Sequence, residues 1–325
     1  MLSDVLRIVR LSGAVFFRAD LALPWAARSV SAEELKQMLL PRAQQMIPFH
    51  VVEHGRCWMA VDGSVPVELA DGDVIVLPHC KEHTIASDIA LAPVPMKDIF
   101  PRPNGRVSTI AVGEGKARTR IVCGFLHCDE QLFNPLCHGL PDIIHVRTTA
   151  EPPGSLLPAL IDSMTREAQA DQDGTACLLS RVSELVFIEV LRRHIASLGP
   201  DTIGWLGALK DPLVGRALRL LHGSPEHPWT VDDLSHQVGA SRSLLADRFR
   251  QFVGQPPMQY LTAWRLQLAA SLLQNGAPSI SAIALQVGYE SEPAFNRAFK
   301  RHTGVPPATW RDRNSARDQA LGKAG

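Results

Sequence analysis

Histidines and cysteines gather at two places in the first half of the chain, where their side chains could bind a metal ion or react with an oxidant. Zinc needs four such side chains in tetrahedral geometry, and neither spacing is a known structural zinc pattern. A cysteine beside histidine or lysine can instead have a lowered pKa and sense oxidants. A third alternative is that the cysteines are small buried apolar side chains. The candidate ligands for zinc or another divalent metal are His50, His79, Cys80 and His83, and the redox candidates are Cys123, Cys128 and Cys137.

The second half of the chain contains an internal repeat. Residues 230–239 are matched 49 residues later by residues 279–288, and Ser241, Phe249 and Gly254 have their counterparts 50 residues later. Each copy predicts a short helix, a turn that opens with glycine, and a second helix that begins at a serine N-cap. This is the layout of a helix-turn-helix motif, whose second helix enters the major groove of DNA.

Helical periodicity divides the second helix of each copy into two faces. Leu245, Phe249 and Phe252 face inward in the first copy, and Phe295 and Phe299 face inward in the second. Outward asparagine and arginine side chains can bond to base edges, and lysine suits phosphates. Two such helices on one monomer would read grooves about one helical turn (~34 Å) apart. The expected DNA contacts are Arg242, Ser243, Ala246, Asp247, Arg250, Glu292, Asn296, Arg297 and Lys300.

The elements around these residues differ along the chain. Short β-branched runs between residues 14 and 147 predict a β-sandwich or small barrel, with a hairpin turn at Asp62-Gly63. Residues 155–197 change to a helical period and predict two helices folded back on each other. The second is apolar on more than one face, which favours core packing with or without self-association. The predicted domains are 1–197 for sensing and dimerisation, 198–210 as linker, 211–313 for DNA binding and 314–325 as tail.

Composition excludes several classes of protein. The chain of 325 residues is 46% hydrophobic and 20% charged, which indicates about two globular domains rather than a disordered chain. It has neither a secretory signal pattern nor an apolar run of about 18 residues, so we expect a cytoplasmic protein without membrane association and with free thiols. The formal net charge of zero conceals an asymmetry, because residues 201–325 hold 14 Lys/Arg against 10 Asp/Glu.

The repeat region resembles the DNA-binding domain of the AraC/XylS family of transcription regulators. This resemblance covers residues 205–313, about a third of the chain. It implies sequence-specific binding to double-stranded DNA, a homodimer and contact with RNA polymerase. Asp247 departs from it, because similar proteins often carry arginine there; the acid would either weaken the first recognition helix or accept a bond from cytosine. The residues that carry the resemblance are Asp233-Leu234, Ser241-Arg242-Ser243, Arg248-Phe249, Gly254 to Pro257, Trp264-Arg265-Leu266, Val287-Gly288-Tyr289, Ala294 to Lys300 and Gly304 to Pro307.

The front half is similar to a cupin. Residues 72–83 look like the second cupin motif, with a Gly-Asp turn, a strand, a proline and His83. Enzymatic cupins add two histidines and a glutamate from their first motif, but the corresponding residues 42–45 contain no histidine pair. The resemblance therefore implies a sensor domain rather than an enzyme. The fold expected for the whole chain is α+β, with an N-terminal cupin-like β-barrel carrying a helical hairpin and a C-terminal all-α domain with two helix-turn-helix motifs.

Together these features predict a DNA-binding transcription regulator whose cupin domain senses a small molecule, an oxidant or a metal and thereby controls DNA binding. The alternative is a metal-dependent cupin enzyme with an appended helical domain. The feature that supports the alternative is the motif that ends at His83. The feature that supports a regulator is the repeat, which reproduces helix, turn, cap and core together.

Overall fold

The structure of the chain is a computed structural model that describes residues 1–9, 11–39, 45–99, 107–128, 139–150, 154–170, 172–199, 202–274 and 278–312. These residues divide into a sheet unit, which contains the described residues from 11 to 128 and from Leu140 to Ser197, and a helical unit, which contains Met1–Val9, Gly139 and the described residues from Leu198 onward. Within the described ranges, no helix is long and apolar enough to cross a membrane.

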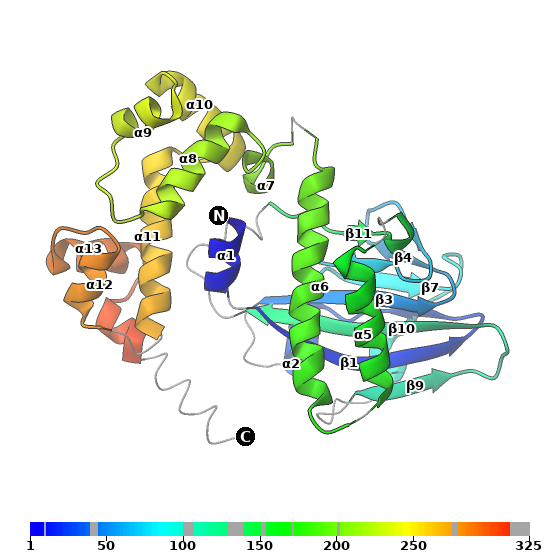
Figure 1. Ribbon diagram of the computed structural model, residues 1–325. Coiled ribbons are helices and arrows are strands. Elements are labelled where there is room, and N and C mark those ends of the chain that lie inside the picture. Colours follow the sequence, from blue (N-terminus) through cyan, green and yellow to red (C-terminus); the bar gives the residue numbers. More distant parts are fainter. Residues whose placement is uncertain are drawn as a thin grey trace. The chain divides into compact units, whose positions relative to one another are not determined.

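Short β-branched runs form two sheets that face each other in the sheet unit (Figure 1). Buried side chains such as Val52, Met59, Ile75 and Ile121 fill the space between them. Burial of each such side chain contributes about 1.5–3 kcal/mol, so this core is the main source of stability in the unit. The six-stranded sheet has the order β11 (Ile144–Val146), β6 (Val74–Val76), β3 (Gln45–His54), β10 (Arg118–Cys128), β1 (Ser12–Ala22), β9 (Ser108–Val112). The five-stranded sheet has the order β5 (Val67–Leu69), β4 (Cys57–Val61), β7 (His83–Ala86), β2 (Ala26–Arg28), β8 (Val94–Pro95).

The two predicted turns of the sheet unit are present. Gly63 has a φ of 79° in the connection between β4 and β5, which is a conformation that glycine adopts without strain. Gly72 precedes β6, and the buried Asp73 carboxylate accepts hydrogen bonds from the Ala70 amide and from Nε2 of His145. The Gly-Asp turn is therefore held by its own aspartate.

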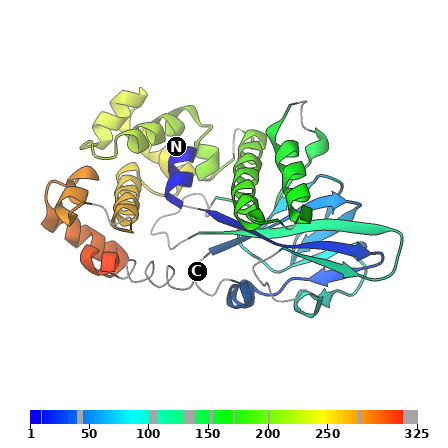
Figure 2. The same cartoon turned by 60° about the horizontal axis from the view of Figure 1, so that its bottom comes forward.

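The predicted helical hairpin is confirmed as α5 (Leu156–Ala170) and α6 (Thr175–Ser197), which lie together on one side of the six-stranded sheet (Figure 2). The approach of α6 to β1 is close, because a Cβ atom at Gly13 would lie 2.6 Å from Cβ of Ser183. Leu178 and Leu185 are exposed on the opposite side of α6. The remaining short helices are α1 (Leu2–Val9), α2 (Ala32–Leu39), α3 (Met96–Ile99) and the 3₁₀ turn η1 (Thr148–Ala150).

The helical unit includes residues that the sequence places in the linker. Trp205 is buried, and its indole N–H donates to the Tyr260 hydroxyl at 2.8 Å. The same hydroxyl lies 2.8 Å from Nε2 of His222, and burial lowers the pKa of His222 to about 4. The core of the unit thus begins before residue 211. Its helices are α7 (Trp205–Ala208), α8 (Pro212–Gly223), α9 (Val231–Val238), α10 (Arg242–Val253), α11 (Pro257–Gln274), α12 (Ile280–Gln286) and α13 (Glu292–Thr303).

Candidate DNA interface and the histidine–cysteine cluster

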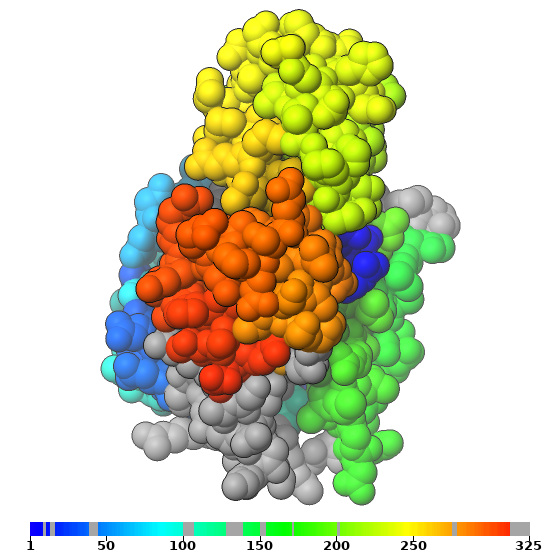
Figure 3. Space-filling model, turned by 90° about the vertical axis from the view of Figure 1, so that its left-hand side faces the viewer, coloured from blue at the N-terminus to red at the C-terminus, as the bar shows by residue number. Residues whose placement is uncertain are grey.

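The two predicted helix-turn-helix motifs are present as α9–α10 and α12–α13. Their corresponding residues adopt the same local structure: Ser241 and Ser291 cap α10 and α13 through their hydroxyl groups, and Phe249 and Phe299 are fully buried. Figure 3 shows the two motifs as adjacent lobes, yellow for the first and orange for the second. The second helix of each motif is therefore the candidate recognition helix.

Asp211 fixes the first recognition helix. Its carboxylate caps α8 by accepting from the Leu213 and Val214 amides at 3.0 and 2.7 Å. It also accepts from Nε and Nη2 of Arg248 at 2.8 and 2.7 Å. Arg248 stands within α10, so the ion pair sets the orientation of this helix against α8. The family motif contains Arg248, and the structure gives it this anchoring contact.

The exposed face of α10 carries cations that stand beside carboxylates. Arg242 is 72% exposed and pairs with Asp232 at the start of α9. Arg250 is 59% exposed and lies 3.9 Å from Asp247, which is itself 78% exposed. Ser243 is exposed beside them. Each arginine thus has part of its charge compensated, which weakens the attraction of this helix for phosphate.

The exposed face of α13 has less compensation. Arg297, Lys300 and Arg301 are exposed, and none of them forms an ion pair within the part of the chain that the structure describes. Glu292 at the start of the helix is half-buried. The second motif therefore presents the stronger positive field to an approaching phosphate chain.

Some predicted contacts are less accessible than helical periodicity indicates. Ala246 and Asn296 are half-buried, and Oδ1 of Asn296 is buried without a hydrogen-bond partner. Sequence reasoning also missed Leu244, which is 53% exposed on α10 and offers an apolar group next to Ser243. Its position one residue before the inward Leu245 is the signal that places it outside the core.

A chain of polar side chains crosses the interior of the sheet unit. His50 on β3 lies directly opposite Cys123 on β10, and the distance between Nδ1 and Sγ is 3.1 Å. Nε2 of His50 is 3.1 Å from Nε2 of His83, which belongs to β7 in the facing sheet. Nδ1 of His83 lies 3.1 Å from the carbonyl oxygen of Lys81. All three side chains are buried.

The direction of each hydrogen bond follows from this geometry. Burial lowers the pKa of His83 to about 4, and it also lowers the pKa of His50, so both rings are neutral near pH 7. Nδ1–H of His83 must donate to the Lys81 carbonyl, which leaves Nε2 of His83 as the acceptor. His50 then donates through Nε2–H and accepts the Cys123 thiol proton at Nδ1.

Among the residues that the structure describes, this cluster does not complete a cupin metal site. Two imidazole nitrogens converge, whereas catalytic metal sites use three protein ligands. Across the described ranges, no group of three or more histidine, cysteine, aspartate or glutamate side chains could hold a metal ion. Of the metal candidates, His50 and His83 meet. His79 instead donates to the Leu140 carbonyl, and Cys80 packs with Met46 and Phe125.

Cys123 is the redox candidate whose side chain lies within the described residues. Burial raises the pKa of the Cys123 thiol, which disfavours the thiolate that reacts with oxidants. Cys137 lies outside the described residues, and so does the side chain of Cys128. The exposed free cysteine in the described ranges is Cys177, at the start of α6.

Comparison with known proteins agrees with both halves of the chain. The profile of a cupin family matches residues 1–196, and that of a helix-turn-helix domain matches residues 234–313. An AraC-like transcription regulator of Streptomyces antibioticus is 35% identical over 83% of this chain and 88% of its own length. The HTH-type transcriptional regulator AlkR of Acinetobacter baylyi is 30% identical over 84% and 90%. A solved AraC-type DNA-binding domain from Chromobacterium violaceum is 33% identical, with 32% of this chain and 92% of that chain covered and a TM-score of 0.30.

A cupin domain joined to two helix-turn-helix motifs defines a DNA-binding transcription regulator. The chain belongs to the AraC-type family of these regulators, in the group with an N-terminal cupin domain. Its relatives are regulators and not enzymes, so the alternative of a metal-dependent cupin enzyme is set aside.

Proposed function

We propose that the sheet unit receives a chemical signal and controls how the two helix-turn-helix motifs engage promoter DNA. The observation that carries this proposal is the duplicated motif, in which the caps Ser241 and Ser291 and the buried Phe249 and Phe299 correspond. We assign sensing and dimerisation to residues 1–197 and DNA binding to residues 211–313. A regulator acts on the chromosome, so the proposed site of action is the cytoplasm.

The two recognition helices differ in how strongly their charges attract DNA phosphates. In this proposal α13 supplies most of the phosphate attraction through Arg297 and Lys300, because these cations are exposed and uncompensated in the described structure. α10 contributes through Arg242 and Arg250, whose neighbouring carboxylates lower their attraction. Asn296 would contact a base only after its side chain turns outward, since its Oδ1 is buried without a hydrogen-bond partner.

The histidine–cysteine cluster is the proposed point of signal reception. The hydrogen bonds run in one direction from Cys123 through His50 to His83, so protonation of either histidine breaks the chain. The facing sheets would then lose a polar contact within an otherwise apolar core. We further propose that the protein forms a homodimer, that it binds an effector and that it contacts RNA polymerase.

Binding-site selection with the full-length protein tests the proposal. We expect selection from random double-stranded DNA to recover a site with two short sequence elements, called boxes here, one for each helix-turn-helix motif. Both boxes should be protected from nuclease. Arg297→Ala should cost about 1–3 kcal/mol and relax base preference at one position if the residue contacts a base, or lower the salt slope by about one if it contacts a phosphate. Arg242→Ala should cost less. Recovery of no sequence preference would refute the proposed function.

A further inference from the structure

We propose that Arg265 fixes the placement of the first helix-turn-helix motif relative to the second and thereby sets the spacing between the two DNA boxes. The inference rests on the proposed function and extends it to a positioning residue on α11, the helix that joins the motifs. Arg265 belongs to neither recognition helix.

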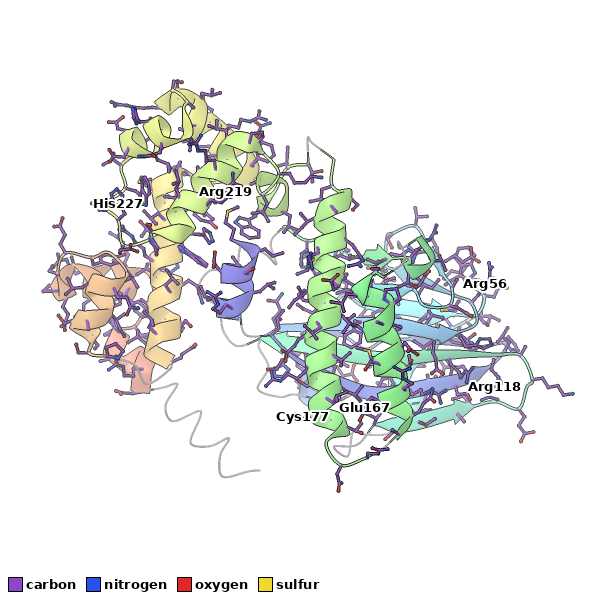
Figure 4. All side chains as sticks on the ribbon, in the orientation of Figure 1. Arg56, Arg118, Glu167, Cys177, Arg219 and His227 are labelled. Carbon is purple, nitrogen blue, oxygen red and sulfur yellow. The ribbon has the colours of Figure 1, made fainter. Side chains whose placement is uncertain are left out.

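The guanidinium of Arg265 holds the loop that leads into the first motif. Nε–H donates to the Pro225 carbonyl at 2.6 Å, and Nη2–H donates to the His227 carbonyl at 2.7 Å. This loop, residues 224–229, is also closed by a bond from the Trp229 indole N–H to the Ser224 carbonyl at 2.9 Å. Figure 4 labels His227 between α8 and the first motif. Two bonds from one planar group restrain the loop against rotation about α11.

The second motif approaches the same guanidinium from its turn. Gly288 opens that turn with a φ of 86°. A Cβ atom at Gly288 would lie 2.8 Å from Nη2 of Arg265 and 2.8 Å from Cα of Glu226. The turn of the second motif is thus in contact with both the arginine and the loop of the first. Glycine is required here for its positive φ and for this close approach.

If α11 were the only connection, the two motifs could move relative to each other; the contacts of Arg265 prevent this movement. Tyr260 and Trp264, near the start of α11, are buried around His222 of α8, whereas Leu266, Ala270 and Leu273 pack into the core of the second motif. One helix can bend or twist between two such cores. The Arg265 contact lies off the helix axis and ties the motifs at a second place.

DNA geometry turns this restraint into a spacing rule. Inserting one base pair between the boxes moves the second box by about 3.4 Å and rotates it by about 34°. Two motifs held rigidly lose contacts at one box after such a change. Two motifs joined by the helix alone can follow the displaced box.

The test measures the affinity of full-length variants for the selected two-box site, for the same site with one base pair added or removed, and for each box alone. For the unmodified protein we expect the altered spacing to lower affinity at least about tenfold, since several base contacts are lost. For Arg265→Gln we expect a loss below about threefold and single-box affinities unchanged within about twofold. Arg219→Gln, which removes an exposed charge of α8, is the matched control and should behave as the unmodified protein (Figure 4).

The affinities distinguish a role of Arg265 in box spacing from a role in maintaining the fold. If Arg265→Gln keeps the full spacing preference, the proposal is wrong. If Arg265→Gln lowers single-box affinity as much as two-box affinity, the contact only maintains the fold, and the proposal is wrong again. If the unmodified protein prefers no two-box site, the proposed function fails instead, and single-box binding distinguishes the two failures.

Discussion

Asp211 offers the sharpest test of how the first recognition helix is held. Its side chain is 2% exposed and makes four hydrogen bonds, two as the cap of α8 and two to Arg248 on α10. Removing a cap costs about 1 kcal/mol. Bonds to charged groups contribute about 1.5–3 kcal/mol, and the half-exposed Arg248 places this pair in the lower half of that range, at about 2 kcal/mol. Asp211→Ala should therefore destabilise the α8–α10 pair by about 3 kcal/mol.

Asp211→Asn separates the two contributions. Asparagine caps helices as well as aspartate does, so this variant should lose about 2 kcal/mol, mainly from the pair with Arg248. Hydrogen exchange of α10 amides in the full-length protein measures both losses. We expect exchange about 150-fold faster in Asp211→Ala and about 30-fold faster in Asp211→Asn.

Amides of α5 and α6 serve as internal controls, because they belong to the sheet unit. Unchanged α10 exchange in Asp211→Asn would show that the ion pair contributes nothing. Equal acceleration in the two variants would show that the cap contributes nothing. Equal acceleration in α5 and α6 would show that the effect is not local.

Three further predictions concern packing and pH. His83 is neutral in the folded and the unfolded chain above about pH 6.5, but burial lowers its pKa to about 4 in the folded chain, so stability should fall by about 3 kcal/mol as pH drops from 6.5 toward 4. A smaller pH dependence of the thermal midpoint in His83→Asn checks this, and identical profiles would contradict it. Gly13→Ala should cost about 1–3 kcal/mol by pushing β1 against Ser183, visible in denaturant unfolding of the sheet unit, while Gly63→Ala, with open space around it, reports backbone strain alone. Phe299→Ala should cost about 3–5 kcal/mol and abolish binding at the second box first, whereas Phe249→Ala should affect the first box first; loss of the same box in both would refute the pairing of motifs with boxes.

Much of the helical unit can be predicted from the sequence because its signals are local. A serine cap, a glycine of positive φ and phenylalanines four residues apart act within one or two helical turns, and Ser241, Gly239 and Phe299 adopt the structures their types predict. The helical hairpin of the sheet unit follows from the same local periodicity.

The histidine–cysteine cluster shows where local signals stop. His50 and Cys123 lie 73 residues apart and meet because strands β3 and β10 pair in a register that the whole sheet determines. His83 comes from the facing sheet. The spacing of histidines along the chain also made His79 and Cys80 equal candidates, although their side chains point elsewhere.

The sequence by itself determined that the chain has a β-rich N-terminal half, a helical hairpin and a duplicated helix-turn-helix motif. The hydrophobic period, the caps and the turn glycines that indicate these elements each involve only a few neighbouring residues. The tertiary structure alone decided which polar groups meet: Asp211 with Arg248, Arg265 with the loop before α9, and His50 with His83. These contacts join segments separated by tens of residues. Their partners are selected by packing and strand register, which no local pattern encodes.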